Sequence, residues 1–129
     1  MAVDEPKEKV LICDDEPTIV ESVRYVVSKL GYDYRVANNG DDALDLAMEF
    51  KPDVMLLDWN MPGLTGIEVC RALKNDPLMR DTYIILLTAN AQVIEQESGL
   101  ASGADRYITK PFSPKGLGQV LTDTFKERQ

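Results

Sequence analysis

The chain has 129 residues, of which 44% are hydrophobic and 28% are charged, and its formal net charge is −8. This length suits one compact domain, and the acidic balance argues against a sequence-independent attraction to DNA or to anionic lipid. No apolar run approaches the length of a membrane span, and the polar N-terminus of mixed charge does not resemble a signal peptide. These observations predict a cytoplasmic protein with no direct nucleic-acid partner and no membrane contact.

The chain has no histidine, which excludes histidine metal ligands and histidine general bases. Cys13 lies in an apolar run and Cys70 in a helical pattern. We therefore expect two buried thiols rather than a disulfide or a metal-binding pair, as is usual in a reducing compartment.

Five short apolar runs recur along the chain and predict strands. They cover residues 10–13, 34–37, 54–57, 83–87 and 106–108. The first, third and fourth runs are nearly continuous in apolar residues, which is typical of interior strands in a parallel sheet covered on both faces. The second run is mixed in polarity and suits the edge of a sheet.

Segments with apolar residues at helical spacing follow each of these runs. They are a helix from Pro17 to about Gly31, a second over 43–50 before Pro52, a third over 67–73, a fourth over 92–102, and a fifth after Pro114. The alternation predicts an α/β fold, a doubly wound five-stranded parallel sheet in (βα)5 order with helices on both faces, giving three layers. Residues 9–127 are expected to form this domain, and residues 1–8 a flexible N-terminal segment.

Polar side chains follow four of the five predicted strands. Residues 14–16 (Asp-Asp-Glu) follow the first strand, Asp58 and Asn60 the third, Thr88 the fourth and Lys110 the fifth. The carboxyl ends of parallel strands meet at one edge of the sheet, where ligands collect. Singly, these residues are explained as helix starts, turn residues or solvated lysines. Their convergence at one edge favours a functional site.

The acidic residues of this edge predict a Mg²⁺ site. Clustered carboxylates need a counter-charge, and Mg²⁺ prefers oxygen ligands with waters completing its shell. Asp15 and Asp58 are the expected carboxylate ligands, with Asp14 close by or acting through water. The backbone carbonyl of Asn60 is expected to add a neutral oxygen.

The same edge suits phosphoryl chemistry. Asp58 can attack phosphorus and form an acyl phosphate, and Mg²⁺ would neutralise charge on the transferring group. Lys110 offers a mobile cation for one phosphoryl oxygen, and the Thr88 hydroxyl can donate a hydrogen bond to another.

Four motifs together resemble the receiver domain of two-component response regulators, and the resemblance covers essentially the whole chain. They are residues 14–16 (DDE), residues 56–63 (LLDWNMPG) with Gly66, residues 87–89 (LTA), and residues 103–105 (GAD) leading into residues 110–112 (KPF). The stretch around Asp58 is also similar to single-domain chemotaxis response regulators. The resemblance implies a flavodoxin-like fold with strand order 2-1-3-4-5.

The resemblance also implies a role for each site residue. Asp58 matches the phosphoacceptor, and Asp15 matches the direct carboxylate ligand of Mg²⁺, with Asp14 as its partner. The carbonyl of Asn60 matches the main-chain ligand. Lys110 matches the lysine that contacts the phosphoryl group, next to a proline that often follows a cis peptide bond.

The resemblance further implies a switch and its partners. Thr88 matches the hydroxyl that moves on phosphorylation, and Tyr107 the aromatic that then turns inward, which changes the face of the fourth helix, fifth strand and fifth helix. The donor would be a sensor histidine kinase or phosphotransfer protein, since this chain has no histidine. The phosphorylated form could dimerise or control an output domain. The chain would be no enzyme beyond its own phosphotransfer and dephosphorylation.

Three other classes of protein share parts of the pattern. An aspartate-nucleophile phosphatase needs an acid two residues after its nucleophile, where this chain has Asn60. A flavodoxin-like FMN carrier needs a phosphate loop rich in Ser, Thr and Gly after the first strand, where this chain is acidic. A phosphate-independent interaction module with an inactive site is the third, although every site group is present.

Overall fold

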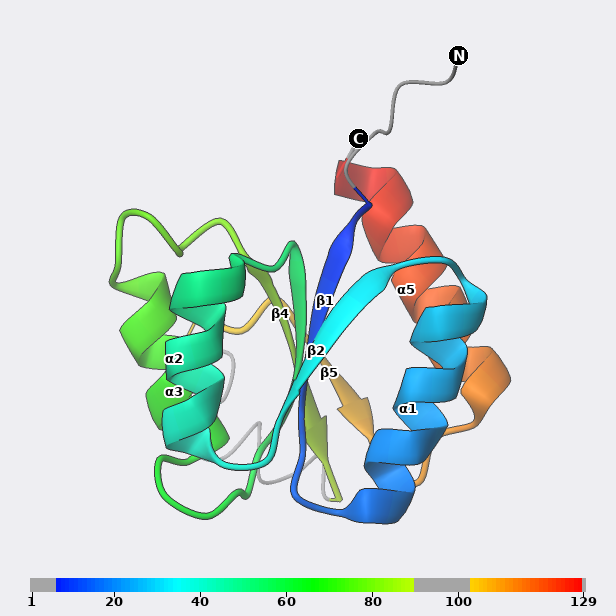
Figure 1. Cartoon of the computed structure of the whole chain (residues 1–129), viewed down its shortest axis with the longest axis horizontal. Helices are drawn as coiled ribbons and strands as arrows, with labels where there is room; N and C mark the ends of the chain where they lie inside the picture. The colour runs from blue at the N-terminus through cyan, green and yellow to red at the C-terminus, as the bar shows by residue number, and fades with distance from the viewer. Residues whose placement is uncertain (1–6, 90–102, 129) are drawn as a thin grey trace.

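The computed structural model describes residues 7–89 and 103–128 of the chain (Figure 1). Its strands are β1 (Lys9–Cys13), β2 (Asp33–Ala37), β3 (Val54–Asp58), β4 (Tyr83–Thr88) and β5 (Arg106–Thr109). The described helices are α1 (Pro17–Lys29), α2 (Gly40–Phe50), α3 (Gly66–Lys74) and α5 (Pro114–Arg128). The helix predicted over residues 92–102 lies outside the described residues, as do residues 1–6 of the N-terminal segment.

The strands form one parallel sheet in the order β2-β1-β3-β4-β5. Helices α1 and α5 cover one face of the sheet, and α2 and α3 cover the other (Figure 1). The predicted three-layer fold is therefore confirmed, with β1, β3 and β4 inside the sheet and the more polar β2 at its edge. Because all five strands run parallel, their carboxyl ends share one edge of the sheet.

Alternate residues of the interior strands face opposite helix layers. Leu11 and Met55 belong to the apolar cluster under α2 and α3, whereas Val10 and Val54 belong to the cluster under α1 and α5. All four are fully buried. Both faces of β1 and β3 are thus covered, which is why these runs are nearly continuous in apolar residues. Cys13 and Cys70 are buried, as predicted.

Local sequence explains where the helices begin. Pro17 occupies the first turn of α1, and its ring fixes a backbone angle that suits that position. The side chain of Asn39 accepts a hydrogen bond from the Asp42 amide at the start of α2. Thr65 and Glu68 form a reciprocal capping box at the start of α3. These caps satisfy amides that have no partner within the helix.

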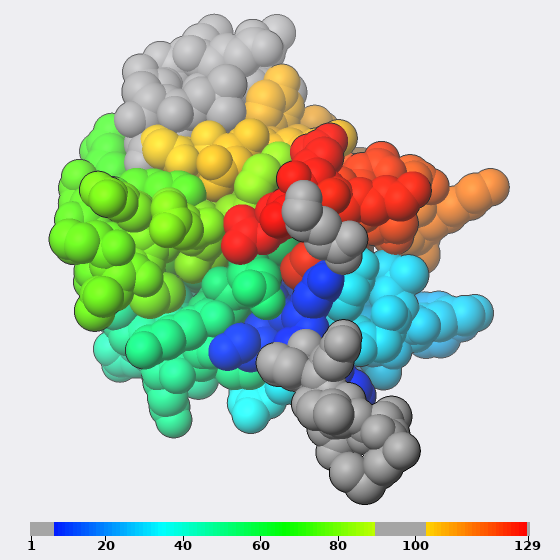
Figure 2. All heavy atoms as spheres, turned by 90° about the horizontal axis from the view of Figure 1, so that it is seen from above, coloured from blue at the N-terminus to red at the C-terminus, as the bar shows by residue number. Residues whose placement is uncertain are grey.

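Polar contacts join neighbouring segments at the amino edge of the sheet, where the strands begin. Figure 2 looks onto this edge and shows the end of α5 (red) beside the start of β1 (blue). Lys74, at the end of α3, donates to the carboxylate of Asp105 at 2.9 Å and to the carbonyl oxygens of Arg80 and Thr82 at 3.0 and 2.7 Å. This single ammonium therefore joins α3 to the starts of β4 and β5.

In the described part of the chain, no helix is both long enough and apolar enough to cross a membrane.

Candidate functional site

The carboxyl edge of the sheet gathers the polar residues that the sequence placed after the strands. Asp58 and Thr88 are the last residues of β3 and β4. They were predicted to follow these strands directly, so each strand ends one residue later than predicted. Their side chains are therefore aimed by the sheet itself, and both are almost fully buried. Asp14 directly follows β1 and is fully buried. Parallel register brings these three positions to the same edge.

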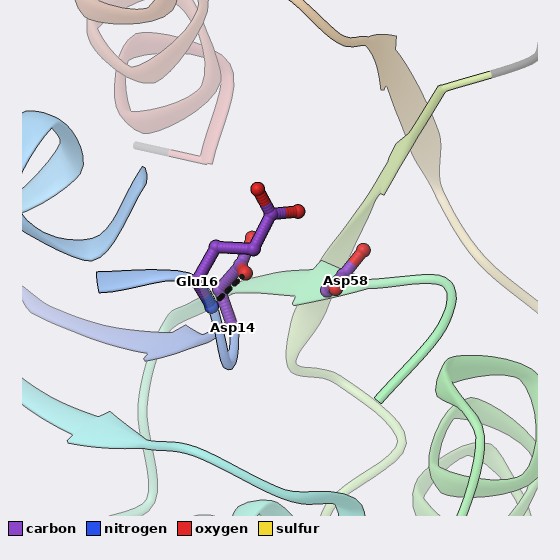
Figure 3. Close-up of side chains that lie close together, drawn as sticks. All are labelled: Asp14, Glu16 and Asp58. Atoms are coloured by element: carbon purple, nitrogen blue, oxygen red, sulfur yellow. Dashed lines mark hydrogen bonds between the residues drawn. The ribbon is translucent and has the colours of Figure 1, made fainter. Parts of the chain in front are cut away.

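The Asp14 carboxylate is held by two donors. One oxygen accepts a hydrogen bond from the Glu16 amide at 2.9 Å, and the other accepts from the Lys110 ammonium at 2.9 Å. The first contact belongs to the turn that leads into α1, so the local chain aims this carboxylate into the site (Figure 3). The second contact spans 96 residues of sequence and depends on the fold.

The Asp58 carboxylate lies beside Asp14 at the end of β3. One of its oxygens accepts from Lys110 at 3.2 Å and, at 3.5 Å, faces the amide of Asn60. Burial raises the pKa of Asp58, and the neighbouring charge of Asp14 raises it further, while Lys110 and the Asn60 amide act in the opposite direction. The ionised form of Asp58 is therefore costly and depends on cations nearby.

The loop after Asp58 is held close to the site by Gly66. Its amide donates to the carbonyl of Trp59 at 3.0 Å, and a side chain at this position would collide with the carbonyl oxygen of Asp58. The absence of a Cβ at position 66 thus lets α3 begin directly against the end of β3.

Lys110 places one ammonium among three carboxylates. Its Nζ lies 2.9 Å from Asp14, 3.2 Å from Asp58 and 3.3 Å from Glu16. Burial disfavours the charged lysine, but hydrogen bonding and attraction to Asp14 and Asp58 outweigh this, so the pKa of Lys110 is raised. The peptide bond from Lys110 to Pro111 is cis, as the resemblance implied.

The oxygens of this site suit a divalent cation. Asp14, Glu16 and Asp58 each offer a carboxylate oxygen, and these atoms all lie within 4.8 Å of one another (Figure 3). Lys110 can neutralise only one of the three charges, and oxygen donors are those that Mg²⁺ prefers. The donor set therefore fits Mg²⁺. Asp15, the predicted direct ligand, is exposed and is not part of this cluster.

A pocket of about 300 Å³ opens beside Asp58. It is lined by Glu16, Asp58, Trp59, Asn60, Thr88, Ala89 and Lys110. The structure thus brings Asp58, Asn60, Thr88 and Lys110 together around one space, with Asp14 beneath them. Tyr107 does not line the pocket; it is half-buried on β5 and packs against the core cluster under α2 and α3.

Glu16 is a member of the site that the sequence did not reveal. In the sequence it is one of three acids before a helix, yet its carboxylate reaches Lys110. Glu16 occupies the N-cap position of α1, but its side chain does not cap the helix. No local signal could have shown this, because Lys110 is 94 residues away in sequence.

Comparisons with known proteins agree with this architecture. The family model described as a response regulator receiver domain matches residues 10–122. The chain is 45% identical over 108 residues to the phosphate regulon transcriptional regulatory protein PhoB of Pseudomonas aeruginosa, covering 84% of this chain and 47% of the relative. It is 39% identical over 115 residues to the DNA-binding response regulator MtrA of Mycolicibacterium smegmatis, covering 89% of this chain and 49% of the relative.

Solved structures show the same fold. The chemotaxis response regulator CheY4 of Vibrio cholerae superposes with a TM-score of 0.85 at 32% identity, covering 91% of this chain and 98% of that one. The receiver domain of the sensor histidine kinase PA1611 from Pseudomonas aeruginosa, with magnesium ion coordinated in its active site cleft, has a TM-score of 0.83 at 28% identity, covering 91% of this chain and 96% of that one.

The chain spans about half the length of the curated relatives that it matches. The name of MtrA describes a DNA-binding protein, which conflicts with the exclusion of a direct nucleic-acid partner made from net charge alone. That exclusion is not retained. Net charge describes the whole chain, and it carries no information about a further domain.

Proposed function

This chain belongs to the response regulator receiver domain family of two-component signalling, and from that premise we propose that Asp58 is the residue that is phosphorylated to set a signalling switch. One observation supports this above the others: the buried Asp58 carboxylate borders an open pocket and lies 3.2 Å from a lysine that also contacts Asp14. The nucleophilic carboxylate of Asp58 therefore lies beside both an ammonium group and a second carboxylate.

The proposed reaction is a phosphoryl transfer to Asp58. A carboxylate oxygen attacks the phosphorus of a phosphohistidine, an O–P bond forms and the P–N bond breaks. The imidazole leaves with the bonding electron pair and takes up a proton. Because this chain has no histidine, the donor is a separate histidine kinase or phosphotransfer protein. Hydrolysis of the acyl phosphate returns Asp58 to its starting form.

Mg²⁺ is the proposed cofactor, and when bound it supplies positive charge that offsets the charge of the phosphoryl oxygens. Asp14 and Asp58 present buried carboxylates for it. Asp15 and the Asn60 carbonyl are the further ligands that the resemblance implies. Asp15 is exposed, so its side chain has to turn inward to serve.

The switch is proposed to run from the acceptor through Thr88 to Tyr107. Thr88 lines the pocket at the end of β4, and its partner in register is Thr109 of β5, two residues after Tyr107. A phosphoryl group adds roughly −1.5 to −2 charges and new acceptors, which draws Thr88 and Lys110 toward it. The state favoured by the phosphoryl group is proposed to alter the face formed by β5, α5 and the helix predicted over residues 92–102, which lies outside the described residues. This face is proposed to contact a target, an output domain or a second copy.

The chain is proposed to act in the cytoplasm, as response regulators typically do. We propose no turnover of external substrates, so that catalysis is limited to its own phosphorylation and dephosphorylation. A DNA-binding output, as in the name of MtrA, is one outcome open to a longer protein that carries this domain.

The test is incubation with acetyl phosphate and Mg²⁺, followed by intact-mass measurement. The expected result is one added phosphoryl group in the wild type and none in Asp58→Asn or in the presence of EDTA. Asp53→Asn is the matched control, because Asp53 precedes β3 at the opposite edge of the sheet. It should be phosphorylated normally. A phosphoryl group that persists in Asp58→Asn contradicts the proposal, and steady release of phosphate from small-molecule substrates would favour a phosphatase.

A further inference from the structure

Glu16 lines the pocket and contacts Lys110, the only lysine among the described residues that line it. Its carboxylate is 3.3 Å from the Lys110 ammonium and 57% exposed. The backbone of Glu16 is fixed, because its amide donates to Asp14 at 2.9 Å. Its side chain is not used as a helix cap, so it is available to Lys110.

The three carboxylates that contact Lys110 differ in burial. An ammonium has three donors, and here each lies within reach of a different carboxylate. The side chains of Asp14 and Asp58 are 0% and 7% exposed, so these two contacts lie inside the site. The contact with Glu16 is the outer one.

A divalent cation held by Asp14 and Asp58 would compete with Lys110 for the same two carboxylates. The two positive charges would also repel each other at such short range. Binding of the cation would therefore weaken the contacts of Lys110 with Asp14 and Asp58. Of its three observed partners, only Glu16 is then left to hold the ammonium beside the pocket.

We propose that Glu16 is a positioning residue that acts through Lys110. It takes the ammonium when a cation occupies the Asp14 and Asp58 oxygens, and it releases the ammonium to the incoming phosphoryl group. This inference rests on the proposed function. It gives Glu16 opposite effects on two steps: it favours cation binding by drawing Lys110 aside, and it slows phosphorylation by competing for Lys110.

The first experiment measures Mg²⁺ affinity by titration. Trp59 is the only tryptophan of the chain and lines the pocket, so its fluorescence can report binding, with calorimetry as a parallel measurement. Glu16→Gln should weaken Mg²⁺ binding about threefold, in the range of partly exposed ion pairs. In a Lys110→Met background the same substitution should have a clearly smaller effect, because no lysine remains to be drawn aside.

Glu21→Gln is the control for net charge. Glu21 lies on α1, pairs with Arg24 and does not line the pocket. This variant should bind Mg²⁺ as the wild type does. If it weakens binding as much as Glu16→Gln, or if Glu16→Gln has the same effect with and without Lys110, then Glu16 acts by charge or direct ligation and the inference is wrong.

The second experiment measures the phosphorylation rate with acetyl phosphate at saturating Mg²⁺. Glu16→Gln should be phosphorylated about twofold faster than the wild type, and a slower rate overturns the inference. A wild type that binds Mg²⁺ but gains no phosphoryl group overturns the proposed function instead. The coupling between Glu16 and Lys110 is then judged from the titrations alone.

Discussion

Two largely buried lysines, at opposite edges of the same sheet, have contrasting surroundings. Lys74 at the amino edge contacts one carboxylate, that of Asp105, and two carbonyl oxygens. Among the described residues, the Lys110 ammonium at the carboxyl edge contacts three carboxylates and no carbonyl. Their side chains are 17% and 12% exposed, so burial alone does not distinguish them.

The difference lies in the balance of charge. At the amino edge one positive charge meets one negative charge, and the remaining donors meet neutral acceptors, so the cluster is complete and joins three segments. At the carboxyl edge one positive charge meets three negative charges. This excess costs stability in the absence of a cation, and it prepares the site for Mg²⁺. A cluster whose charges balance is thus typical of a structural role, and a cluster with an excess of one charge is typical of a functional site.

The largest effect is expected from Lys110→Met without Mg²⁺. This change leaves the buried Asp14 and Asp58 without a counter-charge, so the free energy of unfolding should fall by about 3 kcal/mol. Urea denaturation at pH 7 in EDTA measures it. Added Mg²⁺ should recover much of the loss and stabilise this variant more than the wild type, because binding to the folded state stabilises it and no ammonium then competes for the Asp14 and Asp58 carboxylates. A loss that Mg²⁺ leaves unchanged would contradict the view of this edge as a cation site.

Lys74→Met should reduce the free energy of unfolding by about 2 kcal/mol, because it removes the charge that pairs with Asp105 and the donor to two carbonyl oxygens, while Asp105 keeps only the Ile84 amide. The same denaturation experiment applies. Here Mg²⁺ should stabilise the variant as much as it stabilises the wild type and no more, because Lys74 contacts a single carboxylate, that of Asp105. A selective rescue of Lys74→Met by Mg²⁺ would remove the distinction between the two edges.

Asp58→Asn should stabilise the metal-free protein at pH 7 by about 1 kcal/mol. The pKa of Asp58 is raised in the folded protein. The favourable contribution of Asp58 to the free energy of unfolding is therefore complete below the pKa of the unfolded state, and it is lost as the pH rises through the pKa of the folded state. The advantage of the variant should therefore shrink from pH 7 toward pH 4. Denaturation at the two pH values in EDTA tests this, and an advantage that grows toward low pH would show the sign to be wrong.

Much of the fold could be predicted from local sequence. Continuous apolar runs at residues 10–13 and 54–57 identified interior strands, because a strand covered on both faces has no polar side. Pro17 located the start of α1. The predicted ends of two strands were wrong by one residue, because Asp58 and Thr88 are the last residues of β3 and β4 and do not follow them. The reason is that pairing with a neighbouring strand, which extends a ladder, is not a local property.

The site was predictable as a set of residues but not as a set of contacts. Asp58, Thr88 and Lys110 were found because parallel strands deliver their ends to one edge. The choice between Asp15 and Glu16 as the acid that joins Asp14 was not predictable. It depends on how the turn after β1 directs successive side chains, and only Glu16 is directed toward Lys110.

Periodicity and residue type were enough to predict the order of the described strands and helices along the chain, the burial of the sheet and the kinds of chemical group at its carboxyl edge. The distances between those groups depend on the tertiary structure. Lys110 meets Asp14 across 96 residues, and Lys74 meets Asp105 across 31. Whether a lysine joins one carboxylate or three depends on which loops the folded sheet brings together, and therefore on contacts between distant parts of the chain.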